Sequence, residues 1–201
     1  MINSNIVSIS TMSGKLKGLR AINTSPLSNN WCKVTSRIPG SVCQHCYSAR
    51  MLTTFRMHAN ERFTRNHELL SDACIQDAQL PRFYADEYVR IFAHGEFADS
   101  TQLENIVRIV ELNNLTHFTV WTKRVDLLDT LKYKPDNLQI VQSSLMLNIQ
   151  DIKHKYADIL FTVYDKEHFD TAKADNYCHG KKCVDCMFCY KDSGNVAELL
   201  K

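Results

Sequence analysis

Three cysteines near the start of the chain have a spacing that suits metal chemistry: ten residues separate Cys32 from Cys43, and two separate Cys43 from Cys46. Thiolates two residues apart can converge on one inorganic centre, and the Pro39-Gly40 turn lets the longer arm fold back with a third. Three thiolates leave one iron of a four-iron cluster free to bind a substrate. These loop cysteines therefore favour a [4Fe-4S] cluster with an open iron. A zinc site and three unrelated buried thiols are the alternatives.

A second group follows near the carboxyl end, in the stretch CHGKKCVDCMFCY. These tail cysteines are Cys178, Cys183, Cys186 and Cys189. A contiguous Cys-x2-Cys-x2-Cys run is typical of bacterial ferredoxins, whereas structural zinc sites usually draw their ligands from two well-separated knuckles. We expect a second [4Fe-4S] cluster at the tail cysteines, with structural zinc as the alternative.

The composition indicates a globular chain: 201 residues, 44% of them hydrophobic and 23% charged. A net charge of +2 is too small to indicate a nucleic-acid partner by bulk electrostatics. The sequence has neither a signal-peptide pattern nor a run of about 18 apolar residues, so we expect a cytoplasmic protein with no membrane partner. Eight cysteines in that compartment indicate metal ligation rather than disulfides. We expect Cys74, outside both groups, to pack on the apolar side of a helix.

Hydrophobic patterning predicts strands that alternate with helices. Strands are predicted at 19–24, 88–93, 117–122, 138–143 and 159–164. Helices are predicted at 57–78, 103–112, 125–132, 149–156 and 167–174. Thr101 and Glu104 have the spacing of a capping box for the second helix.

This alternation, with strands that are continuous apolar runs, indicates a parallel sheet covered by helices. Five or six units are too few to close an eight-stranded barrel, so we expect an α/β fold built as a partial (βα)5-6 parallel barrel. A flat doubly wound sheet is the alternative. The barrel is expected over 1–175 and a cysteine-rich extension over 176–201.

In both folds the chemistry belongs at the carboxyl ends of the strands. Those ends carry the loop cysteines, His94-Gly95-Glu96, Lys123-Arg124, Ser143-Ser144 and Asp165.

The loop around Cys32, Cys43 and Cys46 resembles the cluster loop of the radical SAM superfamily, whose usual form is Cys-x3-Cys-x2-Cys. Its ten-residue first gap is similar to members with an expanded loop, including small phage-encoded proteins. His45 fills the position before the last cysteine, which is generally aromatic in the superfamily, and Tyr47 follows that cysteine.

The segment His94-Gly95-Glu96 is similar to the Gly-Gly-Glu-type motif that receives the amino group of S-adenosylmethionine (SAM) in that superfamily, with one glycine replaced. A carboxylate suits an ammonium ligand, and a glycine lets the backbone approach the ligand closely. The stretches VRIFAHGEF and VWTKR also resemble the phage-encoded members. An ordinary turn with a solvated carboxylate is the alternative for this segment.

The resemblance implies a radical SAM enzyme that cleaves SAM to a 5'-deoxyadenosyl radical, with two [4Fe-4S] clusters as cofactors. It implies that the loop cysteines are catalytic and that the tail cysteines hold an auxiliary cluster. The residues implied to contact SAM are His45, Tyr47, Gly95, Glu96, Lys123, Ser143 and Ser144. The implied partner is a low-potential electron donor such as flavodoxin or ferredoxin, and the location is the host cytoplasm if the chain is phage-encoded.

Two other functions compete with this one. A non-catalytic, zinc-stabilised interaction module, such as one that binds nucleic acid, is favoured by a mixture of arginines and aromatics that can hold phosphate and stack on bases. That mixture consists of Arg50, Phe55, Arg56, Arg62, Phe63 and Arg65. A pure electron carrier is the other possibility, but such a protein has no need for five strand-helix units.

Overall fold

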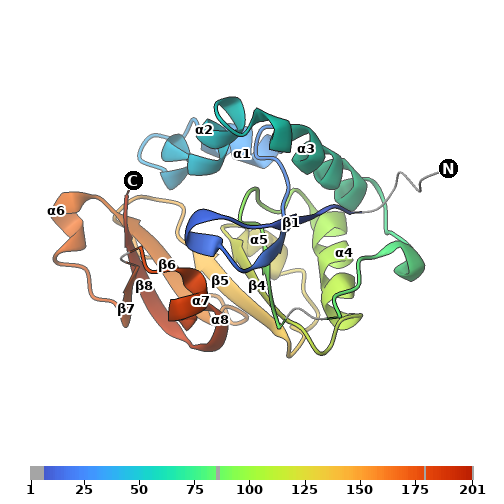
Figure 1. The fold of residues 1–201 in the computed structure, drawn as a ribbon. Coiled ribbons are helices and arrows are strands. Elements are labelled where there is room, and N and C mark those ends of the chain that lie inside the picture. The colour runs from blue at the N-terminus through green and yellow to red at the C-terminus, as the bar shows by residue number, and fades with distance from the viewer. Residues whose placement is uncertain (1–6, 85–86, 179, 201) are drawn as a thin grey trace.

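A computed structural model describes residues 7–84, 87–178 and 180–200, and these form one α/β unit around an eight-stranded sheet (Figure 1). The strand order is β1-β2-β3-β4-β5-β6-β8-β7, and each pair of neighbours is parallel except β1 and β2. The strands are β1 (Ile9–Thr11), β2 (Arg20–Ile22), β3 (Tyr88–Ile91), β4 (His117–Thr122), β5 (Leu138–Ser143), β6 (Ile159–Tyr164), β7 (Asn176–Cys178) and β8 (Gly194–Leu199).

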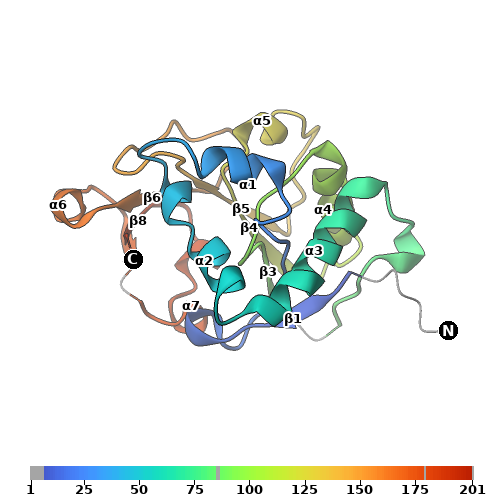
Figure 2. The same cartoon turned by 90° about the horizontal axis from the view of Figure 1, so that it is seen from above.

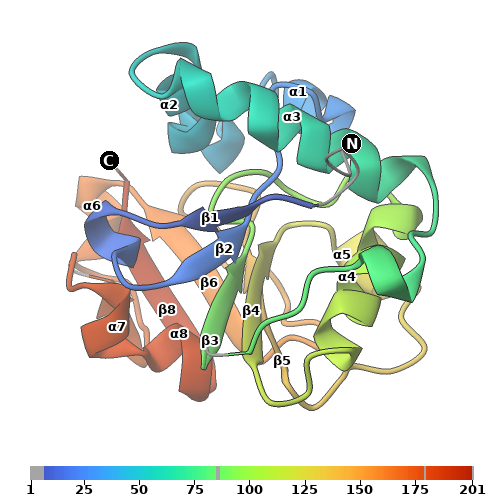
Figure 3. The ribbon, with the colours of Figure 1, turned by 45° about the vertical axis from the view of Figure 1, so that its right-hand side comes forward.

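The helices lie on three sides of this sheet. They are α1 (Asn30–Thr35), α2 (Tyr47–Thr53), α3 (Met57–Asp72), α4 (Ser100–Glu111), α5 (Val125–Leu128), α6 (Lys166–Phe169), α7 (Cys183–Cys186) and α8 (Phe188–Lys191), with 3-10 turns η1 (Gly14–Leu16), η2 (Val42–His45) and η3 (Asp77–Gln79). Two perpendicular views show α1, α2 and α3 above the sheet (Figure 1, Figure 2). Figure 3 shows α4 and α5 on one side of the strands and α7 and α8 on the other.

Side chains alternate between two cores along the central strands. Phe118 and Val120 of β4 belong to the core that includes α3, α4 and α5. Trp121 and Val141 belong to a second core that includes Phe188 of α8. We call the face of the sheet that α8 covers the tail face. Because successive residues of a strand point to opposite faces, this alternation places Trp121 on the tail face and Val120 on the other.

The strand order shows how the predicted parallel sheet is wound. From β2 to β6 each strand neighbours the next in sequence, and this part of the sheet shows none of the order reversal that a doubly wound sheet requires. The observed fold is an open, mostly parallel eight-stranded sheet. No helix in the described part of the chain is long and apolar enough to cross a bilayer.

All five predicted strands are present. Those at 117–122, 138–143 and 159–164 have the expected bounds, and β2 and β3 are shorter than expected. Strands β1, β7 and β8 were not expected. Two of them, β7 and β8, bring the segment 176–200 into the same sheet as β6.

The predicted helix at 149–156 is wrong, because this segment is irregular and two of its isoleucines, Ile149 and Ile152, are exposed. Backbone amides and carbonyls of this segment form hydrogen bonds with side chains at the end of β5 rather than with one another as in a helix. Gln142 accepts from the backbone of His154 at 2.7 Å and donates to the carbonyl of Ile152 at 2.9 Å, and the Ser144 hydroxyl accepts from the Asp151 amide.

The helix predicted at 57–78 ends at Asp72, so Cys74 is exposed and not packed as expected. The cause is Asn105 of α4, whose amide donates to the carbonyls of Leu70 and Ala73, both at 2.9 Å. This side chain satisfies the free carbonyls of the last turn, which helix ends require.

The capping box at Thr101 is also wrong. Asp99 is the N-cap of α4, and its side chain accepts from the Gln102 amide at 2.8 Å.

Candidate cysteine sites at the two ends of the sheet

The loop cysteines lie on three short helical turns above the carboxyl ends of the strands. Cys32 is in α1, whose N-cap Asn29 accepts from the amides of Trp31 and Cys32. Cys43 is in η2, and Cys46 caps α2. All three thiols are partly buried.

Electrostatics place these thiols in one environment. The pKa of Cys32 is raised well above its ordinary value, first by burial and then by the negative charges of Glu96, Cys43 and Cys46. The pKa of Cys43 is also raised by burial, while the Lys123 ammonium opposes the rise. The loop cysteines, Glu96 and Lys123 therefore influence one another, although they come from three separate parts of the chain.

The segment after β3 presses against the end of β2. Gly95 has φ +97°, and a Cβ atom there would lie 2.1 Å from Thr24 Oγ1 and 2.6 Å from the Thr24 carbonyl oxygen. The Thr24 amide donates to the carbonyl of His94 at 3.1 Å, and the His94 amide donates to Asn23 Oδ1 at 3.0 Å. Glycine is therefore required here both for backbone conformation and for close approach.

Glu96 joins the ends of β3 and β4. Its Oε1 accepts from the Thr122 hydroxyl at 2.7 Å and from the Phe97 amide at 2.9 Å, and its Oε2 accepts from the Lys123 amide at 2.8 Å. Burial raises the pKa of this carboxyl, and the Lys123 charge and the hydrogen bonds oppose the rise. A carboxylate offers about four acceptor sites, so three donors leave one on Oε2.

The two basic residues after β4 have different surroundings. The Arg124 guanidinium is committed to the fold, because it bonds to Asp126 and to the carbonyls of Phe97 and Ala98. Among the described residues, the Lys123 ammonium forms no ion pair, yet its charge acts on Cys32, Cys43 and Glu96. Lys123 is thus the cation available at this site.

The aromatic residue after the last loop cysteine reaches the same region through His94. Tyr47 stacks on His94 with ring centroids 6.5 Å apart, and the Ser48 hydroxyl lies 2.8 Å from His94 Nδ1. Burial, with the charges of Arg56 and Arg90, lowers the pKa of His94 to about 4, so this imidazole is neutral near pH 7. His45 is exposed, and among the described residues its side chain forms no hydrogen bond, ion pair or ring contact with the other residues of the site.

Ser143 and Ser144 lie buried where β5 ends. The Ser144 hydroxyl is already used, at 3.0 Å from Thr162 Oγ1. The segment after the serines holds the cysteine loop, because the Val42 amide donates to the Leu145 carbonyl at 2.8 Å and the Leu147 amide donates to the Gly40 carbonyl at 2.9 Å. This pairing was not foreseen, since nothing in the sequence of either segment marks it.

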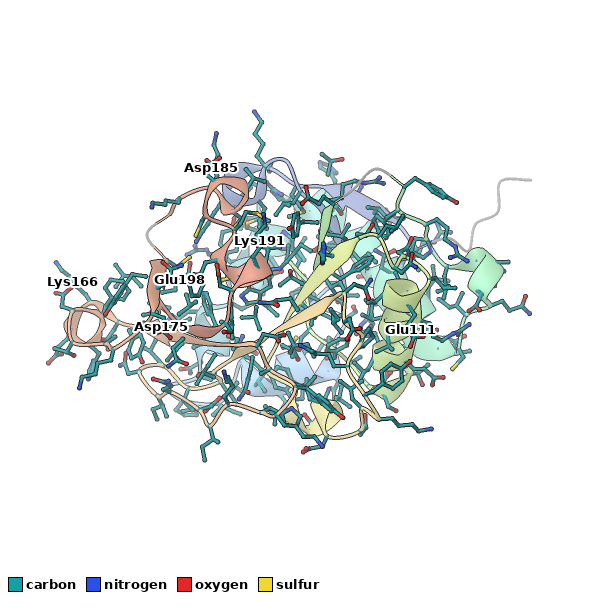
Figure 4. The ribbon with its side chains drawn as sticks, turned by 90° about the horizontal axis from the view of Figure 1, so that it is seen from below. Glu111, Lys166, Asp175, Asp185, Lys191 and Glu198 are labelled. Carbon is teal, nitrogen blue, oxygen red and sulfur yellow. The ribbon has the colours of Figure 1, made fainter. Side chains whose placement is uncertain are left out.

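The tail cysteines form a second group beside the sheet. They lie on β7, α7 and α8, and burial raises the pKa of Cys189 to about 12 while the Arg90 charge opposes the rise. The Lys15 ammonium lies 2.7 Å from Cys178 Sγ and 3.3 Å from Glu198 Oε1. In Figure 4, the view from below, Glu198, Asp185 and Lys191 surround this part of the molecule. Sequence reasoning missed Lys15 and Arg90, because neither is near a cysteine in sequence.

A family model described as Gene product 88 matches residues 4–191. The chain belongs to the Gene product 88 family. The matched range contains both the loop and the tail cysteines of this Gene product 88 protein. No curated protein and no solved structure matches the chain.

The donor chemistry of the Gene product 88 chain fits thiophilic centres, because each group consists of partly buried or exposed free thiols that act on one another electrostatically. Thr24 Oγ1, beside Gly95, is also buried without a hydrogen-bond partner. As placed, no three His, Cys, Asp or Glu side chains of the described residues are arranged to hold a metal ion together.

One of the two aromatics that favoured a nucleic-acid surface is not available to stack on a base in this Gene product 88 protein. Phe63 is 3% exposed and belongs to the core, whereas Phe55 is 71% exposed. Arg56 donates to Ser13 Oγ at 2.6 Å, and Arg62 donates to Ser10 Oγ at 3.4 Å, so both are tied to the β1 segment.

Proposed function

We propose that this Gene product 88 chain is a radical SAM enzyme with its catalytic [4Fe-4S] cluster held by Cys32, Cys43 and Cys46. The observation that carries the proposal is the shared environment of these thiols with Glu96 and Lys123. Three thiols, a carboxylate and a cation at the ends of β2, β3 and β4 are the groups needed to hold a cluster and the two charged ends of an amino acid.

When bound, the cluster supplies the electron that splits SAM into methionine and a 5'-deoxyadenosyl radical. The remaining acceptor site on Glu96 Oε2 takes a hydrogen bond from the SAM ammonium, and the Lys123 ammonium pairs with its carboxylate. Gly95 lets the segment before Glu96 pack closely against Thr24 at the end of β2, which positions the carboxylate. The neutral His94 and the Tyr47 ring over it close one wall of the site.

The open sheet serves this role as a partial barrel, with β2 to β6 as its consecutive strands. We propose that the tail cysteines hold the auxiliary [4Fe-4S] cluster and that a flavodoxin or ferredoxin supplies electrons. In this proposal the enzyme works in the cytoplasm, the host's if the chain is phage-encoded. The reaction abstracts hydrogen from a substrate that lies against the same end of the sheet.

Anaerobic purification with iron and sulfide analysis tests the proposal. We expect two iron-sulfur clusters in the parent protein and SAM cleavage under low-potential reduction. Cys43→Ala removes about half of the iron and all of the cleavage, whereas Cys186→Ala removes iron and keeps cleavage. Cys74→Ala is the matched control, since Cys74 is exposed and outside both groups. A colourless zinc protein, or loss of all iron from either single change, contradicts the proposal.

A further inference from the structure

A lysine from the first turn of the chain contacts the tail cysteines. Lys15 belongs to η1, which connects β1 to β2, and its Nζ bridges Cys178 Sγ at 2.7 Å and Glu198 Oε1 at 3.3 Å. Cys178 and Glu198 are register partners on β7 and β8, so the lysine spans that strand pair. The turn itself lies against α7, because a Cβ atom at Gly18 would be 3.3 Å from the Val184 side chain.

An arginine of the sheet acts electrostatically on two of the same cysteines. Arg90 is a register partner of Thr119, and its guanidinium lies over the Trp121 ring on the tail face. Its Nε is buried without a hydrogen-bond partner, and among the described residues it forms no ion pair with a carboxylate. Arg90 is partly buried and the Trp121 ring stabilises its charge, so negative charge nearby would add to that stabilisation.

The negative charge that suits both cations is that of the tail thiolates. Arg90 acts electrostatically on Cys183 and Cys189, and Lys15 acts on Cys183 as well as contacting Cys178. Four thiolates around a dipositive core carry two net negative charges. Lys15 and Arg90 offset part of that charge, and the Glu198 carboxylate holds Lys15 in position while adding one negative charge of its own.

We propose that Lys15 and Arg90 are counter-cations of the metal centre at the tail cysteines and that they make this centre easier to reduce. The inference rests on the auxiliary cluster of the proposed function. A cation next to a cluster stabilises the reduced state, which carries one more negative charge, and net charge near a cluster is one of the factors that set its reduction potential. Both residues are positioning residues, since they act through the cluster.

The test is a redox titration of the reconstituted full-length protein, followed by electron paramagnetic resonance. Cys43→Ala identifies which signal belongs to the tail centre. We expect Arg90→Gln and Lys15→Gln each to reduce the equilibrium constant for reduction of that centre about tenfold, which is about 59 mV toward negative potential for one electron. Arg90→Lys keeps the positive charge, so its reduction potential should stay close to that of the parent. Lys17→Gln, an exposed lysine next to the same turn, leaves the potential unchanged.

An unchanged midpoint in Arg90→Gln and Lys15→Gln with full iron content overturns the inference. If Arg90→Gln does not fold, Lys15→Gln alone decides, because its ammonium is partly exposed on a surface turn. Zinc at the tail cysteines, with iron at the loop and SAM cleavage intact, overturns this inference and the auxiliary cluster but leaves the proposed radical SAM activity standing. If the variants shift the reduction potential of the tail centre but the parent protein does not cleave SAM, this inference stands and the proposed radical SAM activity is wrong.

Discussion

At the carboxyl end of β3, the Glu96 carboxylate both holds the fold and faces the thiols. Glu96→Gln replaces one carboxylate oxygen with an NH2 group. This donor then faces a backbone amide that is also a donor, so the hydrogen bond between them is lost. We expect the free energy of unfolding to fall by about 1 to 3 kcal/mol because a buried donor is left unsatisfied. SAM affinity should fall about ten- to hundredfold, through the lost charge-assisted contact. Urea denaturation and calorimetric titration of the reconstituted protein measure the two effects.

Glu61→Gln is the matched control for that change, since Glu61 is exposed on α3. If SAM affinity in Glu96→Gln equals that of the parent at equal iron content, Glu96 serves the fold alone and the assignment of the ligand's ammonium is wrong.

A second residue pair gives a pH-dependent prediction. Asp165 Oδ1 lies 2.7 Å from His168 Nδ1, which lowers the pKa of Asp165 to about 2 and raises that of His168 above 6.5. The aspartate contributes stability above its ordinary value of 3.8 and loses it as pH falls toward 2. The histidine contributes stability below 6.5 and loses it as pH rises through its raised pKa.

The pair is therefore most stabilising between about pH 4 and 6.5. Proton NMR titration should give a His168 pKa above 6.5 in the parent and a lower one in Asp165→Asn. Equal pKa values in the two proteins would show that the contact does not persist in solution.

At the scale of elements, the contact between the β2 and β3 ends depends on Gly95. In Gly95→Ala the positive φ costs about 1 to 2 kcal/mol, and the clash with Thr24 adds about 1 to 3 kcal/mol. Gly180→Ala is a close control, because Gly180 has φ +82° but nothing within 4 Å of an added Cβ. Thermal unfolding and loop-cluster iron should both be impaired in Gly95→Ala and nearly normal in Gly180→Ala. Equal effects would mean that backbone strain alone matters.

Packing between α3 and α4 depends on Asn105, which satisfies the last turn of α3 and also accepts from the Ile75 amide at 2.9 Å. Asn105→Ala leaves these buried groups without partners, and we expect a loss of about 2 to 4 kcal/mol in urea unfolding, since each unsatisfied group costs about 1 to 3 kcal/mol. Asn114→Ala, on the exposed turn after α4, should change stability by less than about 0.5 kcal/mol.

The same scale shows what the sequence can predict. Strands β4, β5 and β6 are rich in β-branched, aromatic and other apolar residues and are buried almost throughout, so their composition indicates them. Strands β7 and β8 read NYC and GNVAEL, and their pairing depends on β6, a tertiary effect with no local signal. The spacing of the loop cysteines likewise predicts a metal site from the sequence. Lys15 and Arg90 are distant from the tail cysteines in sequence, so only the folded structure shows that they act on them.

For the whole molecule, the tail cysteines lie at the end of β7 and in the crossover from β7 to the parallel strand β8. The chain leaves β7, passes through α7 and α8 and returns as β8, which pairs with both β6 and β7. A metal centre in this crossover should stabilise β7 and β8 together. We expect the double change Cys183→Ser, Cys186→Ser to raise amide hydrogen exchange in 194–199 and to leave 117–122 unchanged. Uniform exchange across the sheet would mean that the tail centre does not act locally.

Strand β7 is three residues long and covers the outer side of β8. Without β7, the six-residue β8 would be the edge strand of the sheet, with a row of unpaired amide and carbonyl groups. Its residues Val196 and Ala197, now buried, lie in this edge. Such an uncovered strand is a template for pairing with another chain. If the tail cysteines hold the proposed cluster, we expect the metal-free protein to self-associate more than the loaded one, because loss of the β7 pairing would uncover β8.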